Sequence, residues 1–253
     1  MDFNTVNTKI IDSYRKAKNR LILLDYDGTL VHFDTVPERA VPTPYIKNLL
    51  HNLNLQARTQ VAIITGRSYL SIEHFLGNLN LDMIADHGAM VKENNQWRPK
   101  IENNHHWKPY ILEILDKWTQ QYPGSFVESK SFSLAWHFRT LDGELDDSGV
   151  NRLKSELHEK VSEFELQIMN GDKVLEIMPT NLGKAKAAQY VMHRDSFDYI
   201  LSIGDDASDE EIFELLSELE ISHTVKVGSG KSAAKYHIQE IENVHRLLEE
   251  ISK

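Results

Sequence analysis

Four short apolar runs, each followed by a polar or glycine-bearing loop, constrain the fold of this chain most strongly. Their sequences are "LILLD" (21–25), "VAIIT" (61–65), "LDMIAD" (81–86) and "YILSIGD" (199–205). Runs of this length and continuous apolarity are typical of strands buried on both faces of a parallel sheet. Helical patterns lie between them, for example from Pro44 and from Ser68. The alternation predicts an α/β fold, in which ligands collect at the carboxyl ends of the strands.

The middle of the chain departs from this alternation of strands and helices. A helical pattern that stops near Pro123 is followed by "SFVESKSFSLAWHFRT", which is typical of two strands, and by a second helical pattern in roughly 147–164. The next segment predicts a hairpin with its turn at Asn170 and Gly171. We therefore expect an antiparallel α+β insert. The expected domains are a core of residues 1–103 and 181–253 and an insert of residues 104–180.

The C-terminal segment carries a helical apolar stripe. A single helix would place its members on one face. They are Ile238, Ile241, Val244, Leu248 and Ile251.

Charge and composition exclude several classes of function. The net charge of −10 opposes non-specific binding to nucleic acid or to an anionic membrane. With no cysteine, a disulfide, a thiolate zinc site and a thiol nucleophile are excluded, so any metal is held by oxygen or imidazole. The N-terminus lacks the apolar core of a signal peptide, and no run of about 18 apolar residues predicts a membrane span. We therefore expect a soluble, cytoplasmic protein.

Two carboxylates, Asp25 and Asp27, follow the first apolar run. Residues two apart in an extended segment share a face, and like charges so close raise one another's proton affinity unless a cation lies between them. A divalent metal resolves the repulsion, as does a division of labour between a nucleophile and an acid and base. An ordinary turn in "DYDG" is the alternative on these four residues alone.

A second acidic cluster, "SIGDDASDEEIF", follows the fourth run. Glu210 and Glu211 are explained by the favourable interaction of acids with a helix N-terminus. Asp205 and Asp206 have no such explanation, and two acid-rich strand ends in one parallel sheet favour an oxygen-coordinated magnesium site. A solvated acidic loop is the alternative.

The motifs now in view resemble a known family. "DYDGTL", "ITGR", the lysine of "NLGKAKAA" and "GDDASDEEIF" resemble, in order and position, the four motifs of the haloacid dehalogenase-like phosphatases. "DHGA", "VESKSFSLAWHFR" and "GDKVLEIMP" resemble the trehalose-6-phosphate phosphatases within that superfamily, over nearly the whole chain. The resemblance implies a Rossmann-like parallel-sheet hydrolase core with an inserted α+β cap domain.

The resemblance also implies catalytic roles. Asp25 is expected to be the nucleophile that forms an aspartyl phosphate, and Asp27 the acid and base. Thr65 is expected to hydrogen-bond the phosphoryl group, although a helix-capping hydroxyl is the plainer interpretation of that residue alone. Lys184 is expected to neutralise charge on Asp25 and on the phosphoryl group. Because alanine stands where the family has glycine after this lysine, Lys186 is a rival.

The cofactor implied is Mg²⁺. Its ligands are expected to be the carboxylates of Asp25 and Asp205 and the backbone carbonyl of Asp27. Asp206 and Asp209 are expected to support the metal from nearby, directly or through water.

The insert is expected to select the substrate. By resemblance, Glu128, Lys130 and Glu176 bind sugar hydroxyls, and a charge such as Glu176 inside an apolar strand costs several kcal/mol if it is buried unpaired. Ordinary cross-strand ion pairs among these residues are the alternative. The other predicted substrate contacts are Gly66, Arg67, His87 and Arg139, with Arg139 and His137 as weaker candidates and a turn residue as the alternative role of His87.

The reaction implied is magnesium-dependent hydrolysis of trehalose 6-phosphate, a phosphorylated disaccharide, to trehalose. Cap closure about linkers near Asn103 and Pro179 is expected to exclude bulk water. The rivals are a capped phosphatase for sucrose phosphate or mannosyl-phosphoglycerate, a mutase, and a non-catalytic subunit of a trehalose-synthesising complex. A partner synthase cannot be predicted from the sequence.

Overall fold

The protein is described by a computed structural model that covers residues 3–34, 36–102, 104–141, 143, 145–171 and 173–253. The chain divides into two compact units, a core unit of Met1–Lys100 and Gly183–Lys253 and an insert unit of Ile101–Leu182. The sequence predicts the divisions at 103/104 and 180/181. Of the two expected hinges, Asn103 lies outside the described residues and Pro179 ends a strand of the insert. No helix among the described residues could span a membrane.

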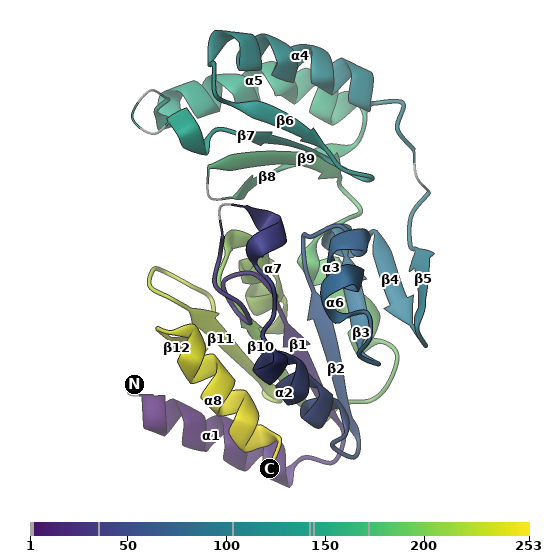
Figure 1. The fold of residues 1–253 in the computed structure, drawn as a ribbon, viewed down its shortest axis with the longest axis vertical. Helices are drawn as coiled ribbons and strands as arrows, with labels where there is room; N and C mark the ends of the chain where they lie inside the picture. Colours follow the sequence, from purple (N-terminus) through teal and green to yellow (C-terminus); the bar gives the residue numbers. More distant parts are fainter. Residues whose placement is uncertain (1–2, 35, 103, 142, 144, 172) are drawn as a thin grey trace. The chain divides into compact units, whose positions relative to one another are not determined.

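The core unit is built around an eight-stranded sheet of described residues with the order β12-β11-β10-β1-β2-β3-β4-β5 (Figure 1). Its pairings are parallel from β12 to β3, and β4 and β5 are antiparallel. Its strands are β1 (Arg20–Leu24), β2 (Thr59–Ile64), β3 (Asp82–Ala85), β4 (Met90–Glu93), β5 (Gln96–Pro99), β10 (Tyr199–Gly204), β11 (Ser222–Val227) and β12 (Tyr236–Ile238). The predicted α/β class with a Rossmann-like parallel sheet is confirmed.

Helices cover both faces of this sheet. They are α1 (Phe3–Lys16), α2 (Pro44–Asn54), α3 (Tyr69–Leu76), α6 (Lys184–Met192), α7 (Ala207–Leu216) and α8 (Ile241–Ile251), with short 3₁₀ turns at Pro37–Arg39 and Asp86–Gly88. Leu21 and Leu23 of β1 share one apolar cluster with residues of α6 and α7, whereas α1, α2 and α8 gather on the other side (Figure 1). Burial on both faces explains why β1 is apolar from Leu21 to Leu24.

Local signals in the sequence set the starts of two of these helices. The Thr43 hydroxyl accepts a hydrogen bond from the Ile46 N–H at the start of α2, and Pro44 is the first helical residue. Ser68 accepts from the Ser71 N–H in the same way at the start of α3. Both helices begin where the sequence predicts.

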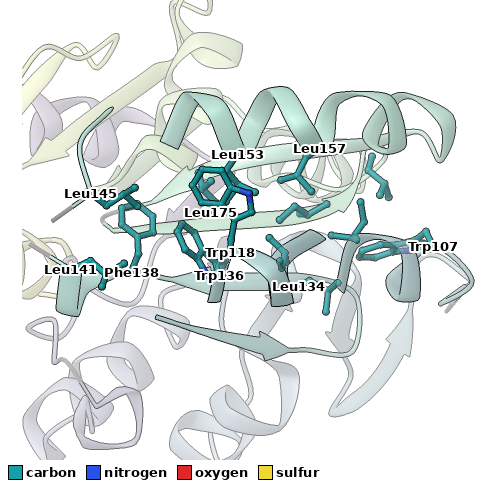
Figure 2. Packing of buried hydrophobic residues seen from close by; sticks show 14 residues of the cluster. Trp107, Trp118, Leu134, Trp136, Phe138, Leu141, Leu145, Leu153, Leu157 and Leu175 are labelled. Carbon is teal, nitrogen blue, oxygen red and sulfur yellow. The ribbon is translucent and has the colours of Figure 1, made fainter. Parts of the chain in front are cut away.

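The insert unit packs two helices on one face of an antiparallel sheet with the order β6-β7-β9-β8. Its core buries three tryptophans, Trp107, Trp118 and Trp136, among leucines of both helices and of the sheet (Figure 2). Trp107 and Trp118 therefore pack the insert core. The elements are α4 (Lys108–Gln121), β6 (Phe126–Ser129), β7 (Leu134–His137), a 3₁₀ turn at Arg139–Leu141, α5 (Asp147–Glu163), β8 (Leu166–Gly171) and β9 (Val174–Pro179).

Two local predictions are wrong. Asn170 and Gly171 end β8 instead of forming the hairpin turn, because the observed register places Ile168 opposite Ile177, an apolar cross-strand pair. A turn at Asn170 and Gly171 would have placed Ile168 opposite Lys173. Ile238 lies in β12 and pairs with Val227, so the C-terminal helix begins at Ile241.

Candidate active site

The carboxyl ends of three neighbouring parallel strands bring the predicted catalytic groups to one edge of the core sheet. Asp25 follows β1, Thr65 follows β2 and Asp205 follows β10. The Asp25 N–H donates to the Ile203 carbonyl of β10, and the Thr65 N–H donates to the Ile84 carbonyl of β3. These backbone hydrogen bonds between neighbouring strands therefore fix where Asp25 and Thr65 leave the sheet.

Asp25 and Lys184 form a buried ion pair. The Lys184 Nζ lies 2.8 Å from Asp25 Oδ1, and the two side chains are 2% and 6% exposed. Lys184 is the first residue of α6, whereas Lys186 is exposed. The structure therefore brings Lys184, not its rival, to the carboxylates.

Asp27 has a different cationic partner. The Arg67 guanidinium donates to both carboxylate oxygens, at 2.7 Å from Nε to Oδ2 and 2.6 Å from Nη2 to Oδ1. Arg67, which the sequence predicts to contact substrate, thus lies against the predicted acid and base. The two acids at the end of β1 are held apart because each pairs with its own cation.

The loop after β10 forms the N-terminus of α7. Asp206 caps the helix by accepting from the backbone N–H groups of Ser208 and Asp209. The Asp209 carboxylate accepts from the N–H groups of Asp205 and Asp206 and from Lys184 Nζ at 2.9 Å. Asp209, predicted as nearby support, is therefore buried against both the loop and the lysine.

Carboxylates outnumber cations at this edge. Asp25, Asp205 and Asp209 each offer an oxygen within 4.8 Å of the others. Burial, with the nearby charges of Asp206 and Asp205, raises the pKa of Asp25 to about 8 against the opposing effect of Lys184. Burial and the charges of Asp206 and Asp209 raise the pKa of Asp205 to about 7. Three hard oxygen donors with one lysine between them suit a divalent cation such as Mg²⁺.

Gly28 is required next to this cluster. It has a φ of +73°, and a Cβ on it would collide with the Asp205 carboxylate. The glycine of "DYDG" therefore lets the turn after β1 approach the loop after β10.

The remaining core residues of the predicted site surround the end of β2. The Thr65 hydroxyl accepts from the Arg67 N–H at 3.1 Å. Gly66 lies against the imidazole of His87. The backbone of His87 is left-handed, with a φ of 52°. The His87 N–H donates to the Thr65 carbonyl and its own carbonyl accepts from the Gly183 N–H. These bonds favour the turn role of His87, since its backbone joins the end of β2 to the start of α6.

The insert brings its predicted sugar-binding residues to one face of its sheet. Ala135 of β7 pairs with Glu128 of β6 on one side and with Glu176 of β9 on the other. Residues paired across strands point to the same face, so both glutamates lie on the face opposite the tryptophan core. Glu176 accepts from Lys130 Nζ at 3.1 Å and from the Ser133 hydroxyl at 2.5 Å. Ala135, between the two glutamates, is fully buried, and Glu176 is buried beside it.

The two weaker candidates lie further along β7. His137 is 3.0 Å from Glu128, and this hydrogen bond lowers the pKa of Glu128 against the effect of its burial. Arg139 is exposed and begins the 3₁₀ turn beyond the end of β7. The hydrogen bond therefore groups His137 with Glu128.

Sequence reasoning missed two residues that hold predicted site residues. Lys226 is buried in β11 and donates to the Asp205 carbonyl. Ser133 holds Glu176 in the insert. The available signal for Lys226 was a lysine directly before "VG" at a strand end. For Ser133 it was its place directly before β7, among the polar residues that alternate with apolar ones there.

Comparisons with known proteins agree with one another. A profile of the family described as trehalose-phosphatase matches residues 23–242. A bifunctional trehalose-6-phosphate synthase/phosphatase of Thermoproteus tenax is 34% identical over 96% of this chain and 33% of its own length. A trehalose-phosphatase of Saccharomyces cerevisiae is 28% identical over 94% of this chain and 32% of its own.

The likeness extends to solved structures. The C-terminal domain of the C. albicans trehalose-6-phosphate phosphatase has a TM-score of 0.89 with this chain at 26% identity, over 97% of this chain and 96% of that one. The two curated relatives are longer than this chain, which spans about a third of their length.

Proposed function

Because the chain belongs to the trehalose-phosphatase family, we propose that it hydrolyses trehalose 6-phosphate to trehalose and inorganic phosphate. The observation that carries the proposal is the buried Asp25, paired with Lys184 beside an excess of carboxylates at the end of the sheet. A nucleophile, cationic groups for the phosphoryl oxygens and a proton donor for the leaving group are the parts that phosphoryl transfer needs.

In the proposed first step, an Asp25 oxygen attacks phosphorus and the bond to the sugar oxygen breaks. Asp27 gives its proton to that oxygen, so trehalose leaves as the alcohol and an aspartyl phosphate remains. In the second step, Asp27 takes a proton from a water molecule whose oxygen attacks phosphorus. The bond between phosphorus and the Asp25 oxygen breaks, and inorganic phosphate leaves. Asp25 is a carboxylate again, and Asp27 again holds the proton that it gave up in the first step.

The other core residues act on charge and orientation. Lys184 supplies positive charge at Asp25, and the Thr65 hydroxyl lies at the end of β2 for a hydrogen bond to a phosphoryl oxygen. The carboxylates of Asp25 and Asp205 and the backbone carbonyl of Asp27 would hold Mg²⁺, with Asp209 close enough to be a further ligand. The cation supplies positive charge for the phosphoryl oxygens when it is bound.

In this proposal the insert selects the sugar. Glu128, Lys130 and Glu176 present charged donors and acceptors on one face of the insert sheet, as recognition of sugar hydroxyls requires. Closure of the insert would exclude bulk water. We propose the cytoplasm as the location. We also propose a synthase as a partner, because the longer Thermoproteus tenax relative is named a bifunctional synthase/phosphatase.

Phosphate release from a panel of sugar phosphates tests the function. The purified chain with Mg²⁺ should release phosphate from trehalose 6-phosphate in preference to sucrose 6-phosphate, mannosyl-phosphoglycerate and glucose 6-phosphate. Release from another sugar phosphate alone would assign a different capped phosphatase. No release from any of them would favour the non-catalytic subunit.

A further inference from the structure

Four hydrogen bonds hold the Arg67 guanidinium. Two go to the carboxylate of Asp27, one to the Pro37 carbonyl at 2.9 Å and one to the Ser71 hydroxyl at 3.2 Å. The Arg67 side chain is 8% exposed and that of Asp27 is 26% exposed. The arginine is therefore buried, and the carboxylate that it holds reaches the surface of the site.

Aromatic rings line the same guanidinium. Its central carbon lies 5.2 Å from the ring centroids of both Tyr26 and Phe75, which stack on each other at 5.9 Å. The Tyr26 hydroxyl is itself tied to the Ala40 carbonyl at 2.8 Å. A guanidinium fixed by rings and by backbone is a rigid support.

This geometry argues against a phosphate contact for Arg67. A guanidinium has five N–H donors, and four are used in the bonds just described. Bidentate binding of a phosphate needs two, so it would require the pair with Asp27 to break. Each Asp27 oxygen, by contrast, accepts one bond from Arg67 and keeps a lone pair for the proton that it exchanges.

We propose that Arg67 is a positioning residue that orients Asp27 for proton transfer, an inference that rests on the proposed function. Asp27 stands on the turn after β1, where the Gly28 N–H bonds the Val31 carbonyl, but this backbone bond leaves the carboxylate free to rotate. The two parallel bonds from Arg67 remove that rotation. A proton donor misplaced by about 1 Å can lose about 10²-fold in rate.

Two variants of Arg67 and one matched control test the proposal. R67A removes the guanidinium, and R67K keeps the charge but cannot make both bonds. Arg20 is the control because its guanidinium is also held by hydrogen bonds, here to three backbone carbonyls, and also lies over a tyrosine ring. It lies at the start of β1, away from the end that bears Asp25. Circular dichroism and thermal melts establish that each variant folds; if R67A does not, R67K carries the test.

The readout is the first turnover, measured by rapid quench with two substrates. The leaving sugar alcohol of trehalose 6-phosphate needs a proton, whereas p-nitrophenolate leaves without one. We expect both Arg67 variants to slow the first turnover of trehalose 6-phosphate about 10²-fold and the first release of nitrophenol less than about fivefold. The half-saturating substrate concentration should not rise, and R20A should keep the wild-type ratio between substrates.

Two further measurements separate positioning from a structural role. Added guanidinium should restore part of the first-turnover rate of R67A, at concentrations that leave the melting curve unchanged. R67A in a D27N background should lose nothing beyond D27N itself, because both changes remove the same proton transfer.

Several results would overturn the proposal. A raised half-saturating concentration with an unchanged rate would make Arg67 a substrate contact. Equal losses of the first-turnover rate on both substrates, with no rescue by added guanidinium, would assign Arg67 a structural role. A wild-type chain that releases no phosphate from either substrate would defeat the proposed function, and the role of Arg67 with it.

Discussion

The core and the insert both carry a buried acidic group beside a lysine, yet their charges balance differently. In the core, Lys184 lies between Asp25 and Asp209 with Asp205 close by, and the pKa values of these acids are raised. In the insert, Glu176 has a lysine and a hydroxyl of its own. The excess of negative charge suits a cation and chemistry at phosphorus, whereas a balanced pair suits recognition of an uncharged sugar.

The largest predicted effect tests the core nucleophile. Asp25→Asn keeps the shape of the side chain but removes the attacking oxygen, so turnover of trehalose 6-phosphate should fall by roughly 10⁴-fold or more. Steady-state phosphate release measures the effect, and Asp116→Asn on the exposed face of α4 is the control. Activity within about tenfold of the wild type would remove Asp25 from the role of nucleophile.

A variant of Lys184 tests whether the lysine between the carboxylates acts through its charge. Lys184→Met should lower kcat by about 10²- to 10³-fold, because the charge 2.8 Å from Asp25 is lost. Lys186→Met, an exposed change two residues later, should keep nearly full activity. The reverse order of effects in the same kinetic assay would restore Lys186 as the functional lysine.

Glu176 tests the recognition side of the comparison. Glu176→Ala should lower kcat/KM for trehalose 6-phosphate by roughly 30- to 100-fold, the loss expected for one or two hydrogen bonds to a charged group. Hydrolysis of p-nitrophenyl phosphate should change little. Glu156→Ala is the matched control, since Glu156 bonds the Trp118 indole of the insert core. Equal losses on both substrates would take Glu176 out of sugar selection.

The smallest effect concerns stability and pH. Because the pKa of Asp25 is raised to about 8 and that of Asp205 to about 7, the folded protein holds protons that the unfolded chain releases near pH 4. The free energy of unfolding without divalent cations should therefore fall as pH rises from about 4 to about 8. Mg²⁺ should raise the melting temperature by a few degrees at pH 8 and by less at pH 5. A Mg²⁺ effect that grew toward low pH would contradict this assignment.

The parts of the fold that were predictable are those whose burial shows in hydropathy. β1, β2, β3 and β10 each contain a short, mostly apolar run, and all four were predicted. β11 was missed because its "SHTVKV" is polar although every residue is buried. Its polar groups are satisfied by tertiary bonds, such as the one from the Lys226 ammonium to the Asp205 carbonyl. Such partners do not appear in a local pattern.

Some features of the candidate site were likewise predictable from the sequence, and others were not. Motif spacing and parallel topology were enough to predict that Asp25, Thr65 and Asp205 meet at one edge. The pairing of Asp27 with Arg67 was not predictable, because it depends on how two side chains forty positions apart turn within the fold. The hydrogen bond of Ser133 to Glu176 likewise depends on the strand register, and a slip of one residue would abolish this bond.

The strand order has a consequence for synthesis on the ribosome. β1 pairs with β10 along one edge, Arg20 against Tyr199, and this partner is translated about 180 residues later. At 5 to 20 residues per second the interval is roughly 9 to 36 s. The whole insert, with its own tryptophan core, is translated within that interval. The nascent chain thus completes its smaller unit while the strand that bears Asp25 still has one unpaired edge, which a chaperone can cover.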